Sequence, residues 1–268
     1  MYTAWMGILS KGRLRAVLVL LSVLLPLACL PQAASGGDPC LRLGMDDWPP
    51  YEFTSKENPL GISTDIVLRV LDDIGQCVES ITEYPWNRGL SLLHDGDLDV
   101  LFSADYRPER LDWARYPDEP LVESAWVVYV RTDRADLRKA ESLDDLKDVE
   151  MGTVRGYSYP RKMREFLARS PQNDPVATDE LNFRRIALGR IDALVCDRYN
   201  GAYLVDKLGL ADKLRLLPEP IAPSTLYPIF SRKSVSPELV KRFDEALLKL
   251  KSGPDYERIL QRWLPQAP

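Results

Sequence analysis

Two apolar runs, far apart in the chain, decide the fold. The first is AWVVYVR at residues 125–131, which is bounded by charge, and the second is the shorter LYPIF at residues 226–230. Continuous apolar runs of this kind are typical of buried strands. Because a strand–helix pattern ends at the first run and restarts after it, we expect two extended crossings that join two lobes.

Before the first crossing, strands and helices alternate. Residues 41–45, 78–82 and 99–102 have the apolar character of short strands. Between them, residues 62–74 carry apolar side chains at helical spacing and residues 88–94 form a second helical stretch. Alternation of this kind predicts a parallel α/β sheet with helices on its faces.

The pattern repeats between the two crossings. Residues 149–154 and 191–196 have strand character, and residues 159–168 have helical character. Ser158 is the expected N-cap of that helix. The tail, residues 237–264, predicts two amphipathic helices.

The predicted architecture is therefore α/β and two-lobed. Each lobe is expected to be a mostly parallel sheet flanked by helices, and two hinge strands join the lobes. Residues 37–128 and 226–268 would form lobe 1, and residues 129–225 would form lobe 2.

The first 36 residues have the pattern of a secretory signal peptide. Three basic residues precede an apolar run at residues 16–30, and small residues follow. The run is shorter than the roughly 20 residues that span a bilayer. We therefore expect export to the periplasm, and the alternative is a lipoprotein acylated at Cys29.

Composition excludes several classes of protein. Of the 268 residues, 45% are hydrophobic, and the formal net charge is −5. The apolar content excludes a disordered chain, and the net charge gives no basic field for nucleic acid. The sequence contains one His, which argues against His-based metal sites and Ser-His-Asp catalysis.

The cysteines become interpretable once export is assumed, because exported proteins form disulfides. Cys40 and Cys77 each stand at the start of a predicted strand. Parallel strands joined by a helix begin at the same edge of the sheet, so we predict a Cys40–Cys77 disulfide. Cys196 is left over as a buried free thiol.

Six motifs occur in a characteristic order. They are LGMD followed by WPPYEF (43–53), LLHDGDLD (92–99), PER (108–110), GTVRG (152–156), LGRIDALVCD (188–197) and GPDYERILQRWL (253–264). Over residues 40–264 the chain resembles the bacterial extracellular solute-binding proteins of the polar amino acid type. These proteins are two-lobed periplasmic receptors that serve ABC importers.

The resemblance implies a set of ligand contacts. Arg110 matches the arginine whose planar fork of donors binds a carboxylate. Gly156, Tyr157 and Ser158 match the segment whose amides complete that carboxylate site. Asp197 matches the carboxylate that binds the ligand's amine.

Three further positions match the family's site, and two others depart from it. Trp48 and Trp86 match the aromatic walls, and Ser103 matches a contact to the amine. Asp105 stands where the family usually has Ser or Thr, and Arg88 adds a cation. These two departures favour a polar, zwitterionic or cationic ligand over an aliphatic amino acid.

The resemblance implies a binding protein rather than an enzyme. We expect a monomer that closes on a small amino-acid-like solute by hinge motion and passes it to an ABC permease, without cofactor, metal or nucleic acid. One alternative is an accessory or sensory binding protein without a transport role. The other is an enzyme similar to cyclohexadienyl dehydratase, although no residue stands out as its general acid.

Overall fold

The computed structural model describes residues 38–169 and 174–264. The signal peptide predicted for residues 1–36, and Cys29 with it, lie outside the described residues. The described residues belong to one compact unit. Within the described part, none of the helices is long and apolar enough to cross a membrane.

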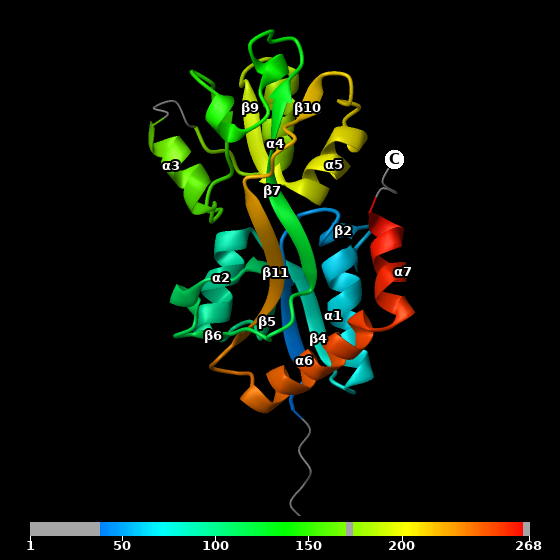
Figure 1. Cartoon of the computed structure of the whole chain (residues 1–268). Helices are drawn as coiled ribbons and strands as arrows, with labels where there is room; N and C mark the ends of the chain where they lie inside the picture. Colours follow the sequence, from blue (N-terminus) through cyan, green and yellow to red (C-terminus); the bar gives the residue numbers. More distant parts are fainter. Residues whose placement is uncertain (1–37, 170–173, 265–268) are drawn as a thin grey trace, which may run out of the picture. The chain divides into compact units, whose positions relative to one another are not determined.

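Strands and helices follow one another along the chain (Figure 1). The strands are β1 (Leu41–Met45), β2 (Phe53–Ser55), β3 (Asn58–Leu60), β4 (Val78–Glu83), β5 (Val100–Asp105), β6 (Ala114–Arg115), β7 (Val122–Arg131), β8 (Met151–Gly152), β9 (Ala193–Asp197), β10 (Leu214–Leu216) and β11 (Ala222–Ser231). The helices are α1 (Ile62–Asp73), α2 (Trp86–Asp95), α3 (Arg161–Arg169), α4 (Asp179–Ala187), α5 (Arg198–Lys207), α6 (Pro237–Lys251) and α7 (Pro254–Trp263).

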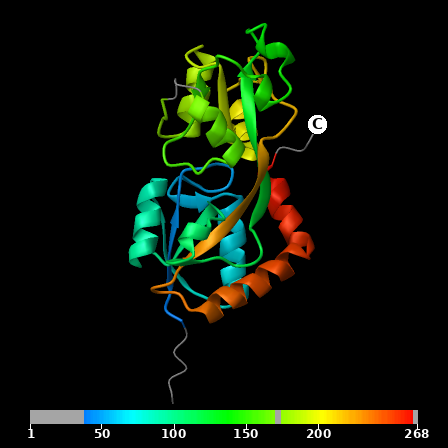
Figure 2. The ribbon, with the colours of Figure 1, turned by 60° about the vertical axis from the view of Figure 1, so that its left-hand side comes forward.

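The two predicted crossing strands lie at the centre of one continuous sheet. The strand order is β4-β1-β5-β11-β7-β9-β8, with β10 on β7 and β6 on β11. The first half of β7 pairs with the first half of β11, and the remaining halves diverge to β9 and to β5 respectively. Each crossing strand therefore belongs to both lobes, as Figures 1 and 2 show.

Pairing direction follows from this arrangement. The β4-β1-β5 ladder and the β8-β9 ladder are parallel, as the strand–helix alternation predicts. The crossing strands pair antiparallel with their neighbours. The two-lobed α/β prediction is confirmed, with the lobes joined by a shared pair of strands. The lobe boundaries predicted at residues 128/129 and 225/226 fall inside β7 and β11, and they stay a prediction.

In lobe 1 the strands bury both faces. Phe102 of β5 packs in the same cluster as α1, α6 and α7, whereas the adjacent Leu101 packs with α2. This alternation is the period of two that a strand imposes on its side chains. The helices cover opposite faces of the sheet in Figure 1.

Lobe 2 repeats the same construction around β7 and β9. Val128 and Val195 pack with Met163 of α3 on one face. On the other face, Val127 and Tyr129 share a cluster with residues of α4 and α5. The crossing strand thus has no face left for solvent, which explains why its sequence reads as a continuous apolar run.

Several element predictions need correction. Helices α4 and α5 and the β2–β3 hairpin were not expected. The strand expected over residues 149–154 is only β8, because Val154 leaves the sheet to form an isolated bridge with Val176. Ser158 is not an N-cap, because α3 begins three residues later, at Arg161.

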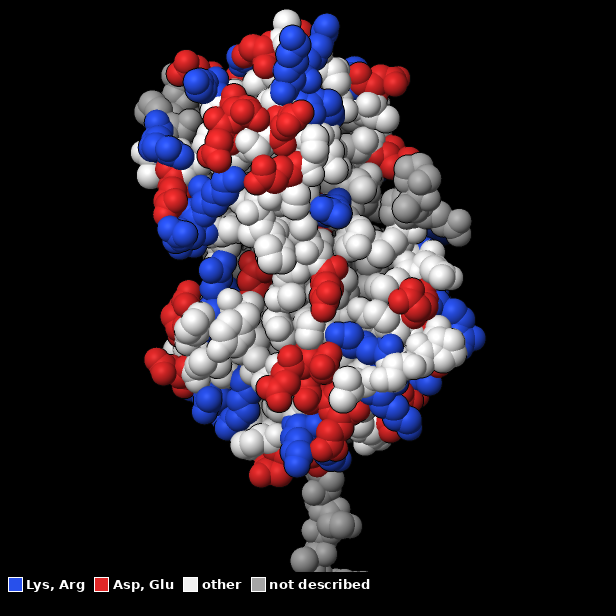
Figure 3. Space-filling model, in the orientation of Figure 1, with Lys and Arg blue, Asp and Glu red and all other residues white. Residues whose placement is uncertain are grey.

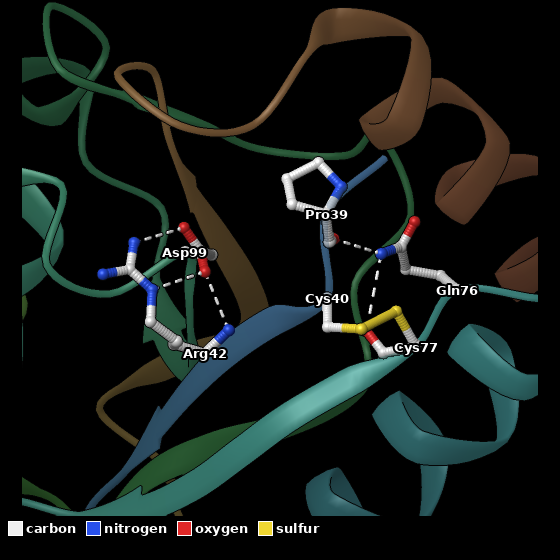
Figure 4. The surroundings of a disulfide bond; sticks show 6 residues. All are labelled: Pro39, Cys40, Arg42, Gln76, Cys77 and Asp99. Carbon is white, nitrogen blue, oxygen red and sulfur yellow. Dashed lines mark hydrogen bonds and ion pairs between the residues drawn. A yellow bond between two sulfur atoms is a disulfide. The ribbon is translucent and has the colours of Figure 1, made fainter. Parts of the chain in front are cut away.

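The predicted disulfide is present. Cys40 and Cys77 are bonded at the starts of β1 and β4, with their Cα atoms 4.6 Å apart (Figure 4). Beside it, Gln76 Nε2 donates to the Pro39 carbonyl, and Arg42 forms an ion pair with Asp99 at 2.8 Å. The parallel strands do begin at one edge, as the prediction required. Cys196 is a buried free cysteine, also as predicted.

Candidate functional site

A cavity opens between the lobes, where the loops after β1 and β5 face the segment before α3. The space free of protein atoms measures about 470 Å³, and part of it is open to solvent. The lining residues are Asp46, Trp48, Glu52, Trp86, Ser103, Asp105, Arg110, Trp126, Tyr157, Ser158 and Leu226. In open α/β sheets, ligands bind at the carboxyl ends of the parallel strands. Both β1 and β5 end at this cavity.

Ser103 is held at the cavity by unusual backbone geometry. Its φ angle is 62°, in the left-handed region that non-glycine residues rarely adopt. The Ser103 hydroxyl donates to Glu52 Oε2 at 2.9 Å and lies 2.9 Å from Ser63 Oγ. Strained residues persist where the surrounding structure requires them, and they cluster at functional sites.

Aromatic rings form much of the wall. Trp48 lies on Tyr51 with a centroid separation of 4.7 Å. Tyr157, from lobe 2, meets the edges of Trp48 and Trp126 at 6.3 Å and 6.4 Å. Such faces pack against apolar groups and attract cations.

Arg110 enters the cavity from the 3-10 turn η1 (Pro108–Arg110). Its Nη1 donates to the Asp105 carbonyl at 3.0 Å, and its guanidinium lies 5.8 Å from the Trp86 ring centroid. The residue is buried. The hydrogen bond and the Trp86 ring hold the guanidinium at the cavity wall. A guanidinium is a planar fork of donors that can bind a carboxylate through two parallel hydrogen bonds.

Asp105 is compensated by groups on its own side of the cleft. Arg107 Nη2 lies 3.6 Å from its carboxylate, and the Ser224 hydroxyl donates to it at 3.2 Å. Burial raises the pKa of Asp105, whereas the Arg107 charge and the Ser224 hydrogen bond oppose that increase. Arg107 also donates to the carbonyl of Ser158 in lobe 2. Asp105 therefore has local partners rather than being a free charge opposite Arg110.

Two other carboxyl groups on the lobe 1 side, Asp46 and Glu52, accept hydrogen bonds but have no ion pair with a basic residue within the described chain. Burial raises the pKa of Asp46 to about 6, an increase to which the charges of Asp47 and Glu83 add. Glu52 is almost fully buried, and this burial together with the charge of Asp46 raises the pKa of Glu52 well above its usual range. Asp46 and Glu52 are hydrogen-bonded through the Asp46 amide, which donates to Glu52 Oε1 at 3.2 Å.

Asp197, which the resemblance assigns to the ligand's amine, is hydrogen-bonded to protein groups through Oδ1, whereas its buried Oδ2 has no hydrogen-bond partner in the described structure. It is the N-cap of α5, accepting from the amides of Tyr199 and Asn200. The Tyr51 hydroxyl also donates to it, at 2.7 Å. Burial raises the pKa of Asp197, and the surrounding hydroxyls and amides act against that increase. Asp197 is not among the residues that line the cavity.

The lobes contact each other directly beside the cavity. Trp48 Nε1 donates to Asp179 Oδ2 at 3.2 Å, and Asn200 Nδ2 donates to the Pro49 carbonyl at 2.6 Å. The Tyr157 hydroxyl donates to the same Asp179 oxygen at 3.1 Å. Burial raises the pKa of Asp179 to about 7 against the effect of these two donors. Together with the Tyr51–Asp197 bond, the Trp48–Asp179 and Pro49–Asn200 bonds join the two lobes, whereas the Tyr157–Asp179 bond lies within lobe 2.

Seven of the ten predicted contact residues line this one cavity: Trp48, Trp86, Ser103, Asp105, Arg110, Tyr157 and Ser158. Asp197 is adjacent but engaged as described. Gly156 is outside the lining and approaches α2, where a Cβ atom would lie 2.7 Å from Asn87 Nδ2. Arg88 is exposed on α2 and is not a lining residue. The structure thus gathers most of the predicted set, and their ligand contacts stay predictions.

Four lining residues were not predicted: Asp46, Glu52, Trp126 and Leu226. Asp46 follows β1 directly, and its position at a strand's carboxyl end was the available signal. Trp126 and Leu226 belong to the crossing strands, where apolar residues read as core. Within the described residues, no group of three or more His, Cys, Asp or Glu side chains could hold a metal ion.

On one face of the molecule, charged residues of both signs are mixed. On the face drawn in Figure 3, basic and acidic residues are interspersed over both lobes. No single-sign field is visible there. The cleft differs from this face in that it contains buried carboxyl groups, Glu52 among them.

Solved structures with the same fold come from several functional classes. A histidine kinase sensor domain similar to periplasmic binding proteins matches with 24% identity and a TM-score of 0.72, over 85% of this chain and 96% of that one. The ancestral amino acid-binding protein AncCDT-1, a precursor of cyclohexadienyl dehydratase, matches with 23% identity and a TM-score of 0.71, over 84% and 95%. The arginine-, lysine-, histidine-binding protein ArtJ from Geobacillus stearothermophilus matches with 20% identity and a TM-score of 0.72, over 85% and 97%.

These likenesses show the fold. No curated protein sequence matches the chain. The family model for bacterial extracellular solute-binding proteins, family 3, matches residues 41–266, which is nearly the whole described chain. With the two-lobed fold and the interlobe cavity, this match shows that the chain belongs to the bacterial extracellular solute-binding proteins, family 3.

Proposed function

We propose that this chain is a periplasmic receptor that captures one small, polar, amino-acid-like solute between its lobes and delivers it to an ABC importer. The observation that supports this most is the cavity itself. Residues from distant segments of the chain line it, and they combine a buried guanidinium, hydroxyl and carboxyl groups with aromatic walls. Small-molecule sites usually combine a mostly apolar lining with a few polar groups.

Hinge closure is the proposed mechanism. The lobes are joined by β7 and β11, so bending these strands opens the cleft without disturbing either core. A ligand that contacts Arg110 in one lobe and Tyr157 or Ser158 in the other binds the closed form better than the open form. That difference in affinity drives closure.

A thermal-shift screen tests this function. The chain without residues 1–36 is heated with amino acids, opines, polyamines and small carboxylates. A ligand at one hundred times its dissociation constant stabilises the fold by about 2.7 kcal/mol, which raises the melting temperature by a few degrees. A hit that R110A abolishes supports the receptor. No hit over the whole panel contradicts it.

Two neighbours motivate alternatives. The sensor-domain neighbour favours a signalling role, in which the same ligand binds but no importer follows. Ligand uptake by cells that lack this chain separates transport from signalling, because only a transport receptor is needed for uptake. The dehydratase precursor motivates an assay of prephenate and arogenate turnover, for which we expect no product.

A further inference from the structure

A second cavity lies on lobe 1 and shares no residue with the interlobe cavity. It is a groove between β6, the end of β11 and α6, the helix at the end of lobe 1 that is far from lobe 2 (Figures 1 and 2). The space free of protein atoms in it measures about 900 Å³, much of it open to solvent. The residues that line this lobe 1 groove are Leu111, Arg115, Tyr116, Pro117, Asp118, Arg232, Pro237, Val240, Lys241 and Asp244.

Two arginines of the groove project from one side of a strand pair. Arg115 of β6 lies opposite Phe230 of β11, and Arg232 follows Phe230 by two residues. The Arg232 amide donates to the Trp113 carbonyl at 3.0 Å, so the antiparallel ladder continues to that residue. Side chains two positions apart point to the same face of a strand, and such diagonal neighbours are about 7–8 Å apart, within reach of long side chains. The ladder therefore places two guanidinium groups beside each other.

Backbone carbonyls hold these two guanidinium groups. Arg115 Nη1 donates to the Val235 carbonyl at 3.0 Å, and Arg232 Nε donates to the Ala114 carbonyl at 3.2 Å. Within residues 38–169 and 174–264, neither guanidinium forms an ion pair with a carboxylate. Burial and the charge of Arg232 lower the pKa of Arg115, against the attraction of Glu238. Because a guanidinium carries five N–H donors, each of the two keeps donors that can bind a ligand.

The remaining charged residues of the groove do not neutralise this pair. Asp244 accepts from the Glu119 amide at 2.8 Å, and Asp118 is exposed. Lys241 of α6 adds a third cation, whose ammonium lies 3.8 Å from Glu245 on the exposed side of the helix. The lining thus contains three cations and two carboxylates, and the two arginines are the cations without a carboxylate partner in the described chain.

The rest of the lining is largely apolar. Pro117 and Val240 are buried, and Leu111 and Tyr116 are half-buried. Guanidinium donors beside apolar side chains suit an anion that is attached to an apolar group. A single guanidinium fork satisfies one carboxylate, whereas the oxygens of a phosphate can accept from two guanidinium groups at once.

We propose that the lobe 1 groove binds the phosphate group of an organic phosphate. Arg115 and Arg232 donate to the phosphate oxygens, and the apolar side chains contact the rest of the ligand. This site goes beyond the proposed receptor function and does not depend on it. The same chemistry occurs in a soluble phosphate ester and in the headgroup of an anionic phospholipid.

Calorimetric titration of the chain without residues 1–36 tests the site with phenyl phosphate, which combines a phosphate with an apolar ring. Inorganic phosphate lacks the ring, and benzoate carries a carboxylate in place of the phosphate. We expect phenyl phosphate to bind about three-fold or more tightly than either comparison probe. Benzoate that binds as tightly as phenyl phosphate overturns the assignment to phosphate.

Co-sedimentation with vesicles distinguishes the two sources of the phosphate. The vesicles contain phosphatidylcholine alone or equal parts of phosphatidylcholine and phosphatidylglycerol. Recruitment to the mixed vesicles that phenyl phosphate reverses assigns the groove to a lipid headgroup. Binding of phenyl phosphate without recruitment assigns it to a soluble phosphate ester. If neither probe binds, the inference is overturned.

Variants of the two arginines locate the site. In R115Q/R232Q both guanidinium groups are lost, so we expect phenyl phosphate to bind about ten-fold or more weakly. The matched control is R161Q/R258Q, which removes the same charge from exposed arginines of α3 and α7 and should bind as the parent does. R232Q alone changes an exposed residue and serves if the double variant does not fold. Parent-like binding by R232Q and by R115Q/R232Q overturns the inference.

Competition separates the groove from the receptor site. Phenyl phosphate is titrated into the chain saturated with the strongest hit from the thermal-shift screen, and we expect its affinity to be unchanged because the two cavities share no residue. Competition between the two ligands would place the anion in the interlobe cavity, which overturns the groove site and leaves the receptor function standing. If the screen gives no hit, the receptor function fails, and the variants still test the groove.

Discussion

The Tyr51 hydroxyl donates a 2.7 Å hydrogen bond to the Asp197 carboxylate and thereby joins the loop after β1 to the first turn of α5. Both residues are almost fully buried. The carboxylate that the family resemblance assigns to the ligand's amine therefore also joins the two lobes through Oδ1, and its binding of a ligand stays a prediction. Closure of this cleft rests partly on contacts between protein groups and not on ligand alone.

Removing this bond should destabilise the chain. Y51F leaves Asp197 with one hydrogen bond fewer in a buried setting, so we expect the free energy of unfolding to fall by about 1–3 kcal/mol. Urea denaturation measures the change. Y106F is the control, because Tyr106 is 47% exposed, and its effect should stay below about 0.5 kcal/mol. Equal effects of the two variants would mean that the interlobe bond contributes nothing.

Stability of the ligand-free chain should fall as pH rises from 5 to 6.5. The pKa of Asp179 is raised by burial to about 7, so the folded chain retains a proton that the unfolded chain has already released. This stabilisation is complete in acid and is lost as pH rises toward 7, at up to about 1.4 kcal/mol per pH unit. Above that pH both the folded and the unfolded chain have released the Asp179 proton, so this group no longer makes the unfolding free energy depend on pH.

Comparison of two variants isolates the contribution of Asp179. D179N removes the titrating group, so its unfolding free energy should vary less steeply between pH 5 and 6.5 than that of the parent. D144N replaces an exposed acid of the same lobe and should keep the parent slope. Parallel slopes in the parent and D179N would show that Asp179 is ionised throughout.

Two arginines offer a matched test of the site. Arg110 is buried and lines the cavity, whereas Arg88 is exposed on α2. For a ligand that carries a carboxylate, R110A should weaken binding by about ten- to a hundred-fold, because a charge-assisted hydrogen-bond pair is lost. R88A should change the affinity less than three-fold. A larger loss in R88A than in R110A would move the site away from the cavity.

The disulfide should stabilise lobe 1. The bond closes a loop between residues separated by 37 positions, which in the chain-entropy treatment corresponds to about 3–4 kcal/mol. We expect the C40S/C77S double variant to unfold at lower urea concentration by that free energy and to keep its ligand affinity. In the parent without residues 1–36, thiol titration under denaturing, non-reducing conditions should count one thiol, from Cys196. A count of three would exclude the bond.

Much of the fold was predictable because burial leaves a periodic trace in the sequence. The helix expected over residues 62–74 is α1, since its inward positions Ile66, Val67 and Val70 recur at helical spacing. The crossing strands were recognisable because both of their faces are buried. The Cys40–Cys77 pairing followed from the shared edge of parallel strands.

Other features depend on contacts that a pattern does not encode. Helix α4 has a Thr178 cap and acids in its first turn, which mark a helix start, but the residues after them lack a strong apolar period. The role of Asp197 depends on Tyr51, a residue 146 positions away. Arg88 lies two residues from a cavity residue, Trp86, yet the helical turn directs it to solvent. Hydrophobic periodicity in a sequence indicates which residues are buried. It does not indicate which partner hydrogen-bonds to a buried acid.

The interlobe cavity is proposed to bind one solute molecule. Isothermal titration of the chain without residues 1–36, using the strongest hit from the thermal-shift screen, tests it most directly. We expect one ligand per chain, a dissociation constant near 1 μM, which corresponds to about −8 kcal/mol, and loss of that binding in R110A. Binding that R110A leaves unchanged, or a stoichiometry other than one, would contradict the account.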